Sequence, residues 1–165
     1  MILWVLLSRR LGKKWPAFFG VLLLGIMTIV AYPIFPPGGM KGPLFAAVFG
    51  GALVGSILLL DSLLADVVDY DELKTRLRRE GAYFGIWKMG TKLSRAVTLL
   101  ASGFMLQSAG FVPNQPQTEE TSWTIALYFG PLVGSFFVIG AILFAFMPMT
   151  DEAHRRIQNI LVRRR

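Results

Sequence analysis

The 165-residue chain has 54% hydrophobic and only 16% charged residues, with a mean hydropathy of +0.56. This balance excludes an ordinary soluble domain of this length. The chain has no cysteine and one histidine, His154, which excludes a disulfide framework and a histidine or thiolate metal centre. The HExxH, GxSxG and Walker A signatures are also absent, so the sequence predicts no enzyme, no metal site and no cofactor.

The apolar residues gather in four blocks of about 20 residues or more, near residues 15–34, 43–65, 81–108 and 123–147. At about 1.5 Å of rise per residue, a helix of that length crosses a hydrocarbon core roughly 30 Å thick. The blocks predict an all-α membrane protein with four transmembrane helices in one domain, residues 1–165. Residues 1–7 are too short to span and predict a helix stub, and residues 148–165 predict a tail whose short helix begins at Thr150.

The net charge of +7 comes from separate basic clusters at alternate ends of the apolar blocks, a pattern that argues against a nucleic-acid partner. Lys41 is the one basic residue in the intervening segments 35–42 and 109–122. Basic loops favour the cytoplasmic side, so we expect a multi-pass protein of the inner (plasma) membrane with a cytoplasmic C-terminus. The three clusters are Arg9, Arg10, Lys13 and Lys14; Lys74, Arg76, Arg78 and Arg79; and Arg155, Arg156, Arg163, Arg164 and Arg165.

Three cations lie inside the third apolar block, at Lys88, Lys92 and Arg95. Their i, i+4, i+7 spacing puts them on one stripe of a helix, which must face protein or water because cations are costly in lipid. Lys92 falls near the middle of the membrane, where transporters place their binding sites, so we predict a role in solute binding or coupling. Arg95 is predicted to line the same site. These extra cations favour an anionic solute.

Carboxylates appear abruptly at the end of the second apolar block. Asp61 is predicted to reach a depth similar to that of Lys88 on the following antiparallel helix, so the two are expected to form a buried ion pair. Asp66 and Asp69 oppose the dipole at the end of their helix. We expect the basic loop after Lys74, or a residue elsewhere in a larger transporter, to compensate them.

The sequence resembles the glycoside-pentoside-hexuronide:cation symporters, the melibiose permease-like family of the major facilitator superfamily. The resemblance rests first on the run Ala65-Asp66-Val67-Val68-Asp69-Tyr70-Asp71-Glu72-Leu73-Lys74-Thr75, followed by Arg78-Arg79-Glu80-Gly81. It extends to Phe111-Val112-Pro113-Asn114, which looks like the family's external loop, and to Arg10-Leu11-Gly12-Lys13-Lys14, which is similar to the end of a cytoplasmic loop motif. Arg76 departs from the family, because many members have glycine there.

The resemblance implies that the chain corresponds to the end of helix eight through helix twelve of a major facilitator fold. It implies cation-coupled symport, with Na+ or H+, of a sugar, glycoside or related solute. Lys92 matches a family lysine near the cation and sugar sites, and Asp66, Asp69 and Tyr70 fall within the matching motif as substrate or coupling residues. The implied partners are the lipid bilayer, the solute and the preceding N-terminal helices of the same transporter.

An alternative interpretation keeps the membrane helices but removes the transport activity. Gly51 and Gly55 form a small-xxx-small pair, a spacing that permits close contact between membrane helices. Dimerisation through this face would suit a small autonomous membrane scaffold or assembly subunit.

Overall fold

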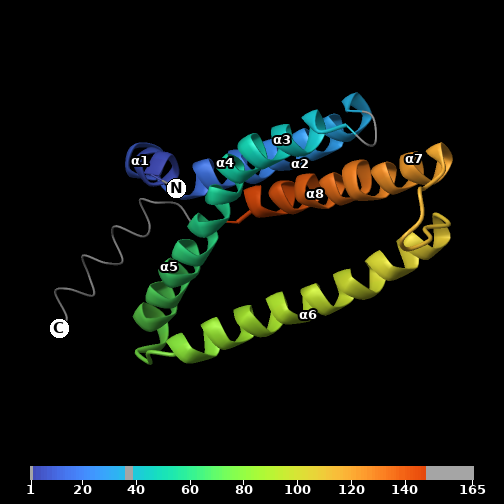
Figure 1. The fold of residues 1–165 in the computed structure, drawn as a ribbon. Coiled ribbons are helices and arrows are strands. Elements are labelled where there is room, and N and C mark those ends of the chain that lie inside the picture. Colours follow the sequence, from blue (N-terminus) through green and yellow to red (C-terminus); the bar gives the residue numbers. More distant parts are fainter. Residues whose placement is uncertain (1, 36–38, 148–165) are drawn as a thin grey trace.

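The computed structural model describes residues 2–35 and 39–147. These residues are helical apart from short connections, and they form five helical rods (Figure 1). The first rod is α1 (Ile2–Leu11), which matches the predicted stub, and the second is α2 (Lys14–Ile34). The tail helix predicted from Thr150 and the third basic cluster lie outside the described residues.

The third rod is continuous but irregular. It begins with α3 (Lys41–Phe45), passes through a π-helical turn at Ala46–Gly50 into α4 (Gly51–Val54), and then tightens into a 3-10 turn at Gly55–Ile57 before α5 (Leu58–Thr75). Each change of hydrogen-bond register alters the direction of a helix. In Figure 1, α3 and α4 run along α2, whereas α5 turns away from it. The rod therefore belongs to the α2 layer at one end and departs from it at the other.

The last rod joins α7 (Glu119–Leu127) to α8 (Val133–Ala145) through a π-helical turn that contains Pro131. It lies beside α2 (Figure 1). Contact is close because a Cβ atom on Gly25 would lie 3.0 Å from the Gly134 carbonyl oxygen, and one on Gly134 would lie 2.7 Å from the Gly25 oxygen. The Cβ position of Gly51, which the sequence analysis placed in a small-xxx-small pair with Gly55, faces open space among the described residues, so a close helix contact at that pair stays a prediction.

The fourth rod, α6 (Glu80–Ser108), stands apart from the α2 and α8 layer. Figure 1 shows it leaving the end of α5 and running to the far end of the molecule, where a loop leads into α7. None of its residues is buried against the rest of the described chain. Its position is therefore set by its two ends and by a few contacts with α5.

Three stretches of the described residues are long and apolar enough to cross a membrane, namely Lys14–Ala31, Ala46–Thr75 and Glu119–Ala145. They coincide with the first, second and fourth apolar blocks of the sequence. The helix α6 has 29 residues, which is ample length, but Lys88, Lys92 and Arg95 lower its hydropathy. The protein is thus a helical multi-pass membrane protein in which the crossing by α6 stays a prediction.

Candidate functional site

The carboxylate of Asp66 is buried and paired with a lysine from a distant part of the chain. Gly12, with a φ of 80°, makes the turn between α1 and α2 and positions Lys13 over α5. The Nζ atom of Lys13 lies 2.7 and 3.0 Å from the two carboxylate oxygens of Asp66, whose side chain is only 5% exposed. The sequence predicted that the basic loop after Lys74 compensates the negative charge of Asp66. That prediction is wrong for Asp66, because its charge is paired with Lys13 of the first basic cluster.

Asp69 and Tyr70 follow on the last turns of α5. Asp69 is half-buried, and Tyr70 is exposed. The Nζ atom of Lys74 lies over the Tyr70 ring, 4.4 Å from the ring centroid. The helix presents Asp66 to the connection between α1 and α2, whereas Lys92 projects from α6. The predicted substrate or coupling residues are thus spread over two helices rather than gathered at one point.

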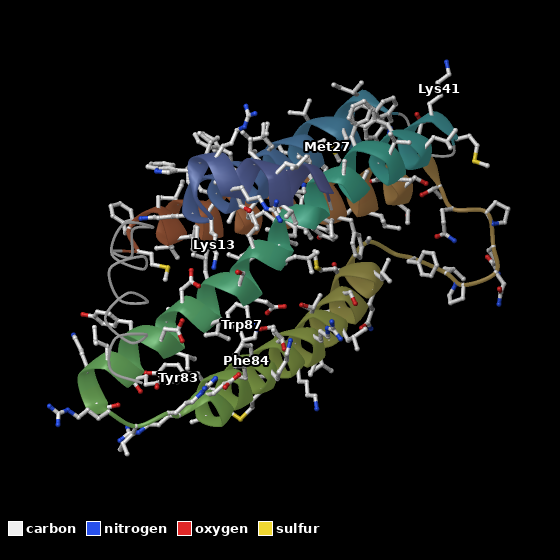
Figure 2. The ribbon with its side chains drawn as sticks, turned by 90° about the vertical axis from the view of Figure 1, so that its left-hand side faces the viewer. Lys13, Met27, Lys41, Tyr83, Phe84 and Trp87 are labelled. Atoms are coloured by element: carbon white, nitrogen blue, oxygen red, sulfur yellow. The ribbon has the colours of Figure 1, made fainter. Side chains whose placement is uncertain are left out.

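A second polar contact ties α5 to α6. The indole Nε1 of Trp87 donates a hydrogen bond of 2.8 Å to Oδ1 of Asp61, and the Nζ atom of Lys88 lies 4.0 Å from the same oxygen. Figure 2 shows Trp87 between the two helices. The depth argument that paired Asp61 with Lys88 is consistent with this placement. Their side chains are 47% and 61% exposed, however, so the burial of the pair and its energetic coupling stay predictions. Sequence reasoning missed Trp87, although its position beside Lys88 was a usable signal.

Lys92 and Arg95 lie further along α6 and are both exposed. Lys92 follows Glu80 by twelve residues, about 18 Å of helix, which puts it near the middle of the rod. Within residues 2–35 and 39–147, neither side chain has an ion pair or a hydrogen bond. The same residues contain no group of three or more His, Cys, Asp or Glu that could hold a metal ion.

Two cavities flank the α5 to α6 contact. One, of about 470 Å³, is apolar and lies between α2, α5 and α8, with Leu63, Phe137 and Phe144 among its lining residues. The other, of about 690 Å³, follows α6 from Tyr83 to Arg95. Trp87 borders both. Its contact with Asp61 therefore lies between an apolar cavity and one that has polar side chains at one end.

These features define a class of protein: a helical multi-pass membrane protein with cations and carboxylates placed within its long helices. Over residues 1–151 the chain matches the family described as MFS/sugar transport protein. The chain therefore belongs to this family of major facilitator superfamily transporters, and it is not an enzyme. The resemblance read from the Asp66 to Gly81 region is confirmed by this match.

Three curated relatives illustrate the family. A symporter of Synechocystis described as uncharacterized is 30% identical and covers 98% of this chain and 31% of its own length. A glucuronide carrier protein homolog of Escherichia coli is 25% identical, and the match covers 90% of this chain and 32% of the relative's length. An isoprimeverose transporter of Lactiplantibacillus pentosus is 26% identical, and the match covers 83% of this chain and 29% of the relative's length. The chain thus spans less than a third of the length of these relatives. No solved structure matches it.

Proposed function

We propose that this chain is part of a secondary transporter that moves a sugar, glycoside or related solute together with Na+ or H+ across the plasma membrane. Membership of the sugar transport family supports this proposal, as does the similarity to a protein named as a symporter. The other two relatives are named for a glucuronide and for isoprimeverose. A glucuronide carries a carboxylate and isoprimeverose carries no charge, so these names leave the charge of the solute open.

In this proposal α6 is a fourth span, corresponding to helix eleven of the complete transporter. Its 29 residues measure about 43 Å, which exceeds the roughly 30 Å of a hydrocarbon core. Its exposed cations would face the preceding helices of the same transporter and the solute path, since lipid does not tolerate them. The match to the sugar transport family over residues 1–151 favours the transporter over the alternative of an autonomous scaffold that dimerises through Gly51 and Gly55.

Lys92 is the single feature that supports the site most directly. It is a cation halfway along a membrane-length helix, exposed, and without an ion-pair partner among the described residues. An ammonium group at that depth must neutralise a carboxylate or bind an anionic group. If it contacts a carboxylate of the preceding helices, it competes there with the coupling ion and links ion binding to closure.

Asp66 has a different role in the proposal. Its burial against Lys13 suits a group that positions the cytoplasmic end of α5, rather than one that contacts the solute. Asp69 and Tyr70 lie on the same end of α5 and are retained as predicted coupling residues, because neither is buried.

The test uses the complete transporter in proteoliposomes, with Lys92→Ala and Lys92→Arg. We expect both changes to abolish uptake against a gradient while membrane insertion remains normal, because Arg keeps the charge but not the compact ammonium geometry. Lys41→Ala is the matched control, since Lys41 is exposed at the opposite end of the molecule from Tyr83 (Figure 2). Uptake by Lys92→Ala at the wild-type rate, with unchanged ion dependence, would contradict the role of Lys92.

A further inference from the structure

The cavity along α6 has two chemically different ends. Its aromatic end is formed by Tyr83 and Trp87, with Leu64 of α5 facing them. Its polar end, about two turns further along the helix, is formed by Thr91, Ser94 and Arg95. The volume of about 690 Å³ is in the range of cavities that hold small organic molecules.

The charge along this cavity is unbalanced. No acidic residue lines it. The carboxylate of Asp61, on the facing helix, accepts the Trp87 hydrogen bond and lies beside Lys88. Lys92 and Arg95 have no such neighbour among residues 2–35 and 39–147. The polar end therefore carries an excess of positive charge.

The hydroxyl groups at the polar end differ in what they can donate. Thr91 Oγ1 donates its hydrogen bond to the Lys88 carbonyl oxygen, so its proton is already engaged. Ser94 Oγ has no hydrogen-bond partner in the described chain, and its proton is available for an acceptor. Arg95 adds a planar guanidinium group whose paired N–H donors match carboxylate, sulfonate and phosphate oxygens. Both free donors at this end thus suit an acceptor that carries negative charge.

We propose that Arg95 and Ser94 form a subsite for the anionic group of the transported solute, and that Tyr83 and Trp87 contact its uncharged body. The proposal rests on the proposed transport function and adds the charge of the solute to it. Trp87 Nε1 is engaged with Asp61, so the ring face of Trp87 is what it presents to the solute. The solute is then an organic anion with a body of sugar size. Lys92 stays the coupling residue, one turn before Arg95.

The test compares uptake of probes that have the same body and differ in charge. Phenyl β-D-glucuronide and a sulfate ester of phenyl β-D-glucoside carry an anionic group, and phenyl β-D-glucoside does not. We expect the complete transporter in proteoliposomes to prefer at least one anionic probe. Arg95→Gln should raise the KM for that probe about 10- to 100-fold and leave the KM for the neutral probe unchanged, which removes the preference. Ser94→Ala should have a smaller effect in the same direction.

The outcomes separate the two proposals. Equal loss of anionic and neutral uptake in Arg95→Gln would show that Arg95 pairs with a carboxylate of the preceding helices, and would overturn the subsite. Preference of the wild type for the neutral probe would also overturn it while leaving symport intact. Absence of uptake of all three probes under both Na+ and H+ gradients would contradict the transport function itself. Arg78→Gln is the matched control, because Arg78 is exposed and paired with Glu80 outside the cavity.

Discussion

At the scale of single residues, the most buried ion pair of the described chain joins α5 to the connection between α1 and α2. Lys13 is 30% exposed at its side chain and Asp66 only 5%. Removing the lysine takes a close counter-ion away from a carboxylate in a site that water reaches poorly, which is more damaging than removing an exposed charge. The pair therefore holds α5 against the connection between α1 and α2.

We predict that Lys13→Met lowers the free energy of unfolding by about 3 kcal/mol, the lower end of the range for breaking a buried pair, since Lys13 is partly exposed. Thermal unfolding in detergent measures the effect. Glu80→Gln is the control, because the Arg78 to Glu80 pair is more than half exposed and should contribute less than about 1 kcal/mol. Adding Asp66→Asn to Lys13→Met should recover part of the loss. Equal effects of Lys13→Met and Glu80→Gln would contradict the structural role of the pair.

Arg76 ends α5 in a conformation that favours glycine. Its φ of 59° and ψ of 16° are left-handed, and its N–H donates to the Glu72 carbonyl oxygen. A residue with a side chain is strained there by about 1 kcal/mol. We predict that Arg76→Gly raises the stability by about that amount, whereas Lys74→Gly, inside the helix, lowers it by about 1 kcal/mol. Unfolding midpoints compare the two variants, and destabilisation by both would count against the capping geometry.

Some of these residues could be predicted from the sequence and others could not, for physical reasons. Asp61 and Lys88 lie on helices joined by one short turn, so the rise per residue fixes their relative depth. Lys13 and Asp66 are separated by 53 positions, and their contact depends on how α1 and α2 pack on α5. Composition and spacing contain no information on that packing. The close contact of Gly25 with Gly134 depends on the packing of α2 on α8, so the sequence did not predict it for the same reason.

At the scale of the elements, the third rod changes direction at Gly55–Ile57, where it packs against two other helices. Ser56 is fully buried there. It lies against Gly20 of α2 and Trp4 of α1, and the indole Nε1 of Trp4 donates a hydrogen bond of 2.7 Å to the Ala52 carbonyl oxygen. A Cβ atom on Gly20 would lie 2.2 Å from that of Ser56. The bend is thus held by a contact that only glycine permits.

We predict that Gly20→Ala costs about 1 to 3 kcal/mol, the usual cost of overpacking, because Ser56 and the bend must both shift. Gly51→Ala is the matched control in the same rod. Its Cβ would meet nothing within 4 Å, so the variant should be neutral or slightly stabilising. Unfolding in detergent gives the comparison. A neutral Gly20→Ala would mean that α2 and the bend are more loosely packed than described.

At the scale of the whole molecule, the orientation in the membrane stays a prediction from charge. The basic clusters before α2 and after α5 favour the cytoplasm, whereas Lys41 and the loop between α6 and α7 fall on the other side. The chain has no cysteine, so single cysteines can be introduced without a background. We predict that Asn114→Cys reacts with a membrane-impermeant reagent from outside, and that Arg78→Cys reacts only after permeabilisation. The reverse pattern would overturn the topology.

The cations of α6, a helix with no buried residue, also bear on how the protein enters the membrane. Each cation near the middle of a helix adds about 2.5 to 3.5 kcal/mol to the cost of entering the bilayer, and α6 carries three of them. The α5 rod, made earlier, and the α7 to α8 rod, made later, are both long and apolar enough to cross a membrane. If α6 is a fourth span, as proposed, we expect it to enter the bilayer as one arm of a hairpin with its apolar neighbours rather than as an independent segment. On this proposal, the cations that would line a polar path along α6 also make its entry into the membrane dependent on the helices on either side.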